Sequence, residues 1–188
     1  VVTAEGIDGG LLRDCDQATG SAVVLRDVNG ENCIVVSAGA NSQTDAAAGE
    51  SAAAAAGPGD VVLMQLEIPT QTVLETAAEG PGVVIVNAAP AGPVPDHLWQ
   101  SVDVLVVNES ELNWYAPIVN GDVAGAMKRI PARAVITTLG GRGCAVRDTD
   151  GTVTSLTCPQ VQVVDTTGAG DAFCGVLAAG IAAGAGIW

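Results

Sequence analysis

Basic and aromatic residues are scarce in this sequence. Only 7 lysines and arginines stand against 21 aspartates and glutamates, and aromatic residues make up 3% of the 188 positions. Nucleic acids and anionic membrane surfaces are bound through basic patches, so the net charge of −14 argues against both as partners. Because Lys128 is the only lysine, a site for an anionic ligand on this chain would depend on backbone N–H groups or bound cations.

Histidine pairs, cysteine pairs and long apolar runs are missing as well. His97 is the only histidine, which leaves little material for a histidine metal site or a Ser-His-Asp triad. The five cysteines form no C-x-x-C pair, so they predict small core residues of a reducing compartment rather than disulfides or zinc ligands. No apolar run reaches membrane-spanning length, and the sequence from Val1 onward has no signal-peptide pattern. We therefore expect a soluble, cytoplasmic protein with no membrane partner.

Short apolar runs alternate with helical patterns along most of the chain. An Asn-Gly turn at 28–31 between two β-branched runs predicts a hairpin of 21–27 and 32–37. An Ala-rich helix is expected at about 45–56. Strands are predicted at 61–66, 83–87, 104–107 and 134–138, and helices at 70–79, 96–100, 110–115 and 122–130. A second hairpin of 143–148 and 152–157 follows, and then a strand ending at 161–164 and a helix at 172–183. This order predicts an α/β fold with a parallel sheet covered on both faces.

Polar or glycine residues follow each predicted strand. Glu67, Asn87, Asn108, Gly140 and Asp165 lie at or just past strand ends. Because ligands of open parallel sheets bind beyond the carboxyl ends of the strands, these positions are candidates for one common site.

The segment 161–178 carries the strongest chemical signal. A strand, a turn of small residues and an apolar helix would direct several free backbone N–H groups and the positive end of the helix dipole at one point. Gly168 and Gly170 allow an anion to approach, and Asp171 places a carboxylate beside it. The alternative is that the glycines only make a tight turn and Asp171 caps the helix.

The string Asp-Thr-Thr-Gly-Ala-Gly-Asp-Ala-Phe-x-Gly at 165–175 resembles the C-terminal signature of the ribokinase-like (PfkB) family of carbohydrate and nucleoside kinases. The resemblance implies a three-layer α/β/α fold with a mostly parallel central sheet and a small β lid. Residues 1–41 would form the lid hairpin region, through which subunits would pair as a homodimer, and residues 42–188 the kinase core with the nucleotide site. Compared with the family, an N-terminal part and the C-terminal end are missing, so the sequence is either partial or a truncated product.

The resemblance also assigns roles at the phosphate end of the site. It implies that Asp171 is the base for a sugar hydroxyl and that the N–H groups of Gly168, Ala169 and Gly170 stabilise the transferring phosphoryl group. Glu67, in a string similar to that of the ribose-phosphorylating members, would contact the sugar together with Asp171. Taken from the sequence alone, the default interpretation of Glu67 is a solvated residue at a strand end.

Further assignments concern the nucleotide and its ions. Asn108 and Glu111 match an Asn-x-x-Glu motif, in which the Asn lies near the phosphates and the Glu organises Mg²⁺ through water; by themselves they also predict a capping box. The strip 138–143 is not a P-loop, because no Gly-Lys-Ser/Thr follows it. It could be only a flexible turn, but the resemblance sets it against ATP. Asp165 and Thr167 would ligate a monovalent cation, usually K⁺, if they do more than shape the turn. The implied ATP contacts are Asn108, Thr138, Leu139, Gly140, Gly141, Arg142, Gly143 and Gly170.

The function implied is ATP-dependent phosphorylation of a sugar primary hydroxyl, D-ribose to D-ribose 5-phosphate in the first instance. Fructokinase, 2-keto-3-deoxygluconate kinase and nucleoside kinase activities remain as alternatives within the family. A non-catalytic protein that binds nucleotide or sugar is the alternative outside enzymes.

Overall fold

A six-stranded sheet forms the centre of the molecule in the computed structural model, which describes residues 2–26, 32–80 and 82–186. The strands are ordered β3-β4-β5-β6-β7-β8. The first four are parallel, and β7 and β8 continue the sheet antiparallel. Their bounds are β3 (Val61–Gln65), β4 (Val83–Asn87), β5 (Val104–Asn108), β6 (Ala134–Thr138), β7 (Cys144–Arg147) and β8 (Val153–Leu156).

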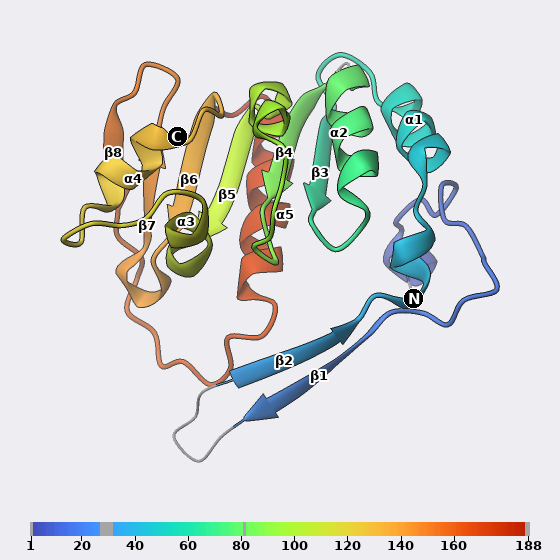
Figure 1. The fold of residues 1–188 in the computed structure, drawn as a ribbon, viewed down its shortest axis with the longest axis horizontal. Coiled ribbons are helices and arrows are strands. Elements are labelled where there is room, and N and C mark those ends of the chain that lie inside the picture. Colours follow the sequence, from blue (N-terminus) through green and yellow to red (C-terminus); the bar gives the residue numbers. More distant parts are fainter. Residues whose placement is uncertain (1, 27–31, 81, 187–188) are drawn as a thin grey trace.

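Helices cover both faces of this sheet (Figure 1). On one side lie α2 (Thr70–Glu79), η3 (Asp96–Ser101), α3 (Glu109–Tyr115) and α4 (Val123–Arg129), with α1 (Ala46–Ala55) packed against α2. On the other side lies α5 (Ala169–Ala182), drawn in red behind the sheet. The three-layer α/β/α prediction and the mostly parallel sheet are therefore confirmed.

Alternation along the strands divides the core into two layers. On β4, Val86 belongs to the apolar cluster between the sheet and the helices α2, η3, α3 and α4. Its neighbour Ile85 belongs to the cluster between the sheet and α5. Leu105 and Val106 divide in the same way on β5. Successive side chains of a strand point to opposite faces, so strands that are apolar at every position can be buried on both sides. This explains why runs such as Val-Val-Ile-Val form the central strands.

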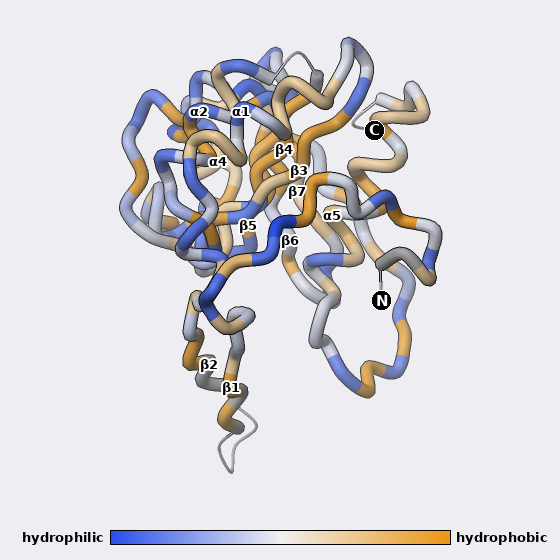
Figure 2. Tube along the Cα trace, turned by 90° about the vertical axis from the view of Figure 1, so that its right-hand side faces the viewer, coloured by the Kyte–Doolittle hydropathy of each residue, from blue (hydrophilic) through white to orange (hydrophobic). Residues whose placement is uncertain are grey.

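The predicted first hairpin is present as a separate two-stranded sheet. β1 (Ser21–Arg26) and β2 (Asn32–Ser37) pair antiparallel, with Ser21 opposite Ser37. The predicted turn at 28–31 and Asp27 lie outside the described residues. The hairpin extends away from the body at the end of the molecule to which the carboxyl ends of the parallel strands point (Figures 1 and 2). Apolar side chains on it are more than half exposed: Val23, Leu25, Val35 and Val36.

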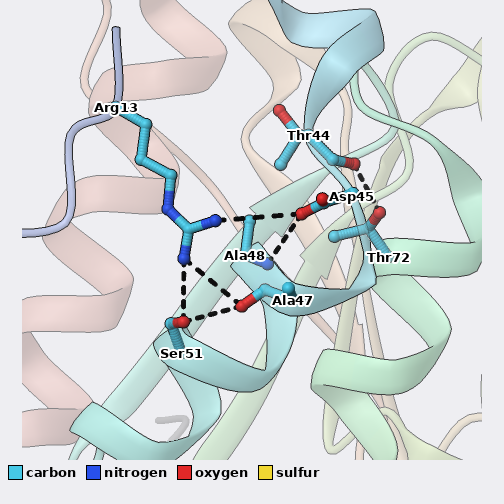
Figure 3. A network of polar contacts seen from close by, with 7 residues as sticks. All are labelled: Arg13, Thr44, Asp45, Ala47, Ala48, Ser51 and Thr72. Carbon is cyan, nitrogen blue, oxygen red and sulfur yellow. Dashed lines mark hydrogen bonds and ion pairs between the residues drawn. The ribbon is translucent and has the colours of Figure 1, made fainter.

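A polar network fastens the segment before the hairpin to α1 (Figure 3). The Arg13 guanidinium donates to Ser51 Oγ at 2.9 Å and to the Ala47 carbonyl oxygen at 3.4 Å. It also lies 3.8 Å from Oδ1 of Asp45, whose side chain caps α1 by accepting from the Ala48 amide. Exposed ion pairs of this kind contribute little to the stability of the fold. The network instead holds the segment around Arg13 against α1.

One predicted element is wrong. Residues 157–168 form no strand, and Val161, Val163 and Val164 are 74%, 63% and 94% exposed. A β-branched run becomes a strand only by pairing with a neighbouring strand, and this segment leaves the edge strand β8 to reach α5 without pairing. Two smaller differences are that 96–100 forms the 3₁₀ helix η3, and that α5 starts at Ala169 rather than 172. None of the helices in the described ranges combines the length and apolar character needed to span a bilayer.

Candidate active site

The carboxyl ends of the parallel strands and the start of α5 enclose a cavity of about 230 Å³, here called the central cavity. A wider pocket of about 440 Å³ adjoins it and shares Gln65, Glu67, Asn87, Asp171 and Cys174. The strand-end residues Glu67, Asn87 and Asn108 therefore meet at one site, as the sequence predicted. The central cavity is lined by Gln65, Glu67, Asn87, Ala89, Val106, Val107, Asn108, Glu111, Thr138, Gly168, Gly170, Asp171 and Cys174.

A second, more apolar cavity of about 420 Å³ lies along the strip after β6 and is here called the glycine-strip cavity. Gly140, Gly141 and Gly143 line it, and so do Val161 and Val163. The exposed valines that do not form a strand thus contribute an apolar wall, which the sequence reasoning missed. Thr138 and Gly170 line both cavities and connect them.

The start of α5 presents free amides to the central cavity. Gly168 is the N-cap residue with φ 74°, a left-handed conformation that glycine adopts without strain. Among the described residues, the N–H groups of Gly170 and Asp171 donate to no acceptor, whereas the Ala169 amide donates to the Thr166 carbonyl oxygen at 3.1 Å. Two free amides, those of Gly170 and Asp171, therefore lie at the start of α5, whereas the Ala169 amide, also predicted for this site, is already engaged.

Asp171 does not cap its own helix. No side chain caps α5, so the alternative capping role for this carboxylate is not the one adopted. Instead, Asp171 Oδ1 accepts a hydrogen bond from Gln65 Nε2 at 3.1 Å. Gln65 is the last residue of β3, and sequence reasoning did not select it. Its position two residues before Glu67, at the end of a strand, was the only signal available.

Asn108 and Glu111 form the predicted capping box at the start of α3. The Glu111 amide donates to Asn108 Oδ1 at 2.8 Å, and the Asn108 amide donates to Glu111 Oε2 at 2.7 Å. Both residues nevertheless line the central cavity, so capping does not remove them from the site. Burial raises the pKa of the Glu111 carboxyl above its ordinary value, and the hydrogen bond from Asn108 opposes this shift in part.

The strip after β6 needs glycine at its end. Gly143 has φ 95°, and a Cβ there would lie 1.9 Å from the Leu156 carbonyl oxygen. Leu139 packs against the main core, and the Arg142 guanidinium is paired with Glu109. Among the predicted nucleotide contacts, Leu139 and Arg142 thus line neither cavity, whereas Gly140, Gly141 and Gly143 do.

The predicted monovalent-cation ligands lie just before α5. Asp165 Oδ1 accepts from both the amide and the hydroxyl of Thr167, each at 2.8 Å, so their oxygens are adjacent. Neither residue lines the two cavities. Within the described part of the chain, no cluster of three or more His, Cys, Asp or Glu side chains is arranged to hold a metal ion.

The charge of the site is one-sided. Glu67, Glu111 and Asp171 line the central cavity, and no Lys, Arg or His belongs to the described walls of either cavity. A polyanionic ligand would meet repulsion from these carboxylates, which only amides, the α5 dipole or bound cations could offset.

Comparison with known proteins gives a consistent result. The sequence model described as pfkB family carbohydrate kinase matches residues 2–187. The bifunctional ribokinase/ribose-5-phosphate isomerase A of Fructilactobacillus sanfranciscensis is 38% identical over 180 residues, which cover 89% of this chain and 33% of that protein. The crystal structure of ribokinase from Thermotoga maritima matches with a TM-score of 0.80 and 29% identity, covering 92% of this chain and 59% of the other. Arabidopsis thaliana ribokinase complexed with ribose and ATP matches with a TM-score of 0.73 and 28% identity, covering 92% and 59%. The chain thus spans between a third and three fifths of the proteins it resembles.

Proposed function

Because this chain belongs to the pfkB family of carbohydrate kinases, we propose that the protein transfers the γ-phosphoryl group of ATP to the primary hydroxyl of D-ribose, giving D-ribose 5-phosphate. The observation that carries the proposal is Asp171, a carboxylate on the central cavity beside the free amides of Gly170 and Asp171 itself. The similarity to ribokinases, one of them complexed with ribose and ATP, supports the choice of ribose.

In the proposed step, the sugar hydroxyl oxygen attacks the γ-phosphorus as its proton passes to the Asp171 carboxylate. The bond from the γ-phosphorus to the bridging oxygen breaks, and ADP leaves. The amides of Gly170 and Asp171 and the positive end of α5 stabilise the charge that develops on the transferring group. A positioned base contributes about 10²–10⁴-fold in rate.

The two connected cavities suggest how ATP would lie. The apolar glycine-strip cavity suits the adenine ring, with Gly140, Gly141 and Gly143 along its edge. The phosphates would then pass the shared residues Thr138 and Gly170 into the central cavity, where Asn108 offers its side-chain amide. Glu67, on the same cavity, would bind sugar hydroxyls together with Asp171.

We propose Mg²⁺ and a monovalent cation such as K⁺ as cofactors, since acidic walls without basic side chains need cations to accept a polyphosphate. Glu111 is a hard oxygen donor on the central cavity and would hold Mg²⁺ through water. The adjacent oxygens of Asp165 and Thr167 would be two of the ligands of a monovalent cation. When bound, these ions would neutralise the phosphate charge.

The hairpin is the proposed lid and dimer surface. Residues 1–41 would form the lid region and 42–188 the kinase core. Val23, Leu25, Val35 and Val36 are exposed on the projecting hairpin, and a second copy of the chain would cover them (Figure 2). A monomer in sedimentation equilibrium would contradict this pairing. We place the protein in the cytoplasm, where its described cysteines, Cys15, Cys144, Cys158 and Cys174, would stay reduced.

The test is an ADP-release assay on the purified chain and on the complete reading frame that encodes it. Ribose, deoxyribose, fructose and adenosine are compared with and without K⁺, and ATP binding is measured separately. Asp171→Asn should lower kcat about 10²–10⁴-fold and keep ATP binding. Asp150→Asn, on the β7–β8 turn, is the matched control and should change neither. ATP binding without turnover on any acceptor would favour a non-catalytic protein.

A further inference from the structure

The hydrogen bond between Gln65 and Asp171 joins two elements that are distant in sequence. Gln65 ends β3 and Asp171 lies in the first turn of α5, 106 residues later. Nε2 of Gln65 donates to Oδ1 of Asp171 at 3.1 Å. Both side chains line the central cavity, and both line the wider pocket beside it. The contact therefore lies inside the site and is not part of the packed core between β3 and α5.

The two carboxylate oxygens of Asp171 have different surroundings. Oδ1 is the oxygen bound to Gln65. Oδ2 faces the helix start, because a Cβ placed on Gly168 would lie 3.9 Å from it. The free amides of Gly170 and Asp171 belong to the same turn. Oδ2 is thus the oxygen nearer to Gly168, the N-cap residue of α5, and no described residue donates a hydrogen bond to it.

We propose that Gln65 is a positioning residue for the phosphoryl transfer, holding Oδ1 of Asp171 so that Oδ2 accepts the proton of the acceptor hydroxyl. This inference rests on the proposed function. In the step, the sugar O–H bond breaks, its proton moves to Oδ2, the new O–P bond forms, and the bond to the ADP oxygen breaks. Gln65 itself takes up no proton and forms no bond to substrate.

The chemistry of the cavity explains why an amide suits this position. Glu67 beyond β3 and Glu111 of α3 also face the cavity, and neither can donate to an ionised carboxylate without first taking up a proton; the Cys174 thiol of α5 is only a weak donor. A lysine or arginine at position 65 would donate but would also pair its charge with Asp171 and weaken it as a base. The glutamine amide orients the carboxylate and adds no charge.

Three variants separate this role from a structural one. Gln65→Leu removes the donor at similar size and should lower kcat up to about 100-fold, the scale of a misplaced reacting group, with little change in the KM for ATP. Gln65→Glu puts a second carboxylate beside Asp171. Two carboxylates so close share one proton, so the pKa of Asp171 should rise in Gln65→Glu. The acidic limb of the kcat–pH profile should therefore lie at higher pH in Gln65→Glu than in Gln65→Leu. Gln71→Leu is the matched control: Gln71 donates to Glu75 on α2, outside both cavities, and its loss should leave kcat unchanged.

The experiment distinguishes failure of this inference from failure of the proposed function. If the wild-type protein phosphorylates a sugar but Gln65→Leu keeps kcat within twofold and Gln65→Glu leaves the pH profile in place, Gln65 does not position the base. If the wild-type protein has no turnover, the proposed function fails. The contact is then judged by NMR, because the side-chain amide proton resonances of Gln65 should shift in Asp171→Asn; unchanged resonances overturn the contact as well.

Discussion

Asn108 has two separable tasks, and two substitutions should separate them. Its Oδ1 accepts from the Glu111 amide at 2.8 Å and so caps α3. Its side-chain NH₂ group donates to no described residue and lies on the central cavity, where the proposed phosphates would pass. Asn108→Ala removes both groups. Asn108→Ser keeps an oxygen that can cap a helix but removes the NH₂ donor.

The magnitudes follow from these contacts. Losing a side-chain N-cap acceptor costs about 1 kcal/mol, while the second bond of the box survives because the Asn108 backbone amide donates it. For a domain of this size that corresponds to a Tm lower by about 2–4 °C in Asn108→Ala and almost no change in Asn108→Ser. A hydrogen bond to a charged phosphate contributes about 1.5–3 kcal/mol, so both variants should bind ATP about 10-fold to 150-fold more weakly.

Thermal unfolding followed by circular dichroism gives Tm, and isothermal titration with Mg·ATP gives the dissociation constant. The melts are run without nucleotide, since bound ligand would itself raise Tm. If Asn108→Ser lowers Tm as much as Asn108→Ala, the capping account is wrong. If Asn108→Ser binds ATP as tightly as the wild-type protein, the side-chain amide does not contact the nucleotide.

Three further outcomes are expected. Thr137 is fully buried with a hydroxyl that has no partner among the described residues, so Thr137→Val should raise the free energy of unfolding in urea by about 1 kcal/mol, and Thr137→Ser should not. Burial raises the pKa of Glu111 above 4.5, so the stability that its protonated form contributes is present below pH 4.5 and is lost as pH rises through the raised pKa. Between pH 4 and 7 the free energy of unfolding of Glu111→Gln should therefore increase relative to that of the wild-type protein. A difference that stays constant with pH would contradict the shift. Mg·ATP should slow alkylation of Cys158, which lines the glycine-strip cavity, but not of the exposed Cys15; mass spectrometry that finds equal protection, or none, would place the adenine elsewhere.

The sheet was predictable because its strands are defined locally. The bounds of β4 and β6 agree with the prediction at every residue, since each is a short buried run of apolar residues that ends in polar ones, Asn87 in β4 and two threonines in β6. The helix α2 was likewise predicted over its full length. Site residues at strand ends followed directly, because parallel strands bring their carboxyl ends to one edge. Glu67, Asn87 and Asn108 meet there for this reason, and the start of α5 brings Asp171 to the same edge.

What the sequence did not predict depends on contacts between distant segments. Val161, Val163 and Val164 have the composition of a strand, but their segment pairs with neither edge strand of the sheet, β3 or β8, and pairing is not encoded locally. Gln65 has no distinguishing neighbour in sequence, because its partner lies 106 residues away. The use of the Ala169 amide by Thr166 is also a detail of turn geometry that composition cannot specify.

The charge of the central cavity bears on which acceptor it would take. Glu67 and Asp171 are both on the walls that would receive the sugar, and no basic side chain belongs to the described walls. An acceptor with its own carboxylate, such as 2-keto-3-deoxygluconate, would add a third negative charge next to these two, with no basic side chain on the described walls to pair with it. A neutral polyhydroxy acceptor instead offers hydroxyl donors to both carboxylates and keeps Asp171 as the only base that must take a proton. Among the acceptors that the family phosphorylates, this electrostatic pattern therefore supports an uncharged sugar such as ribose.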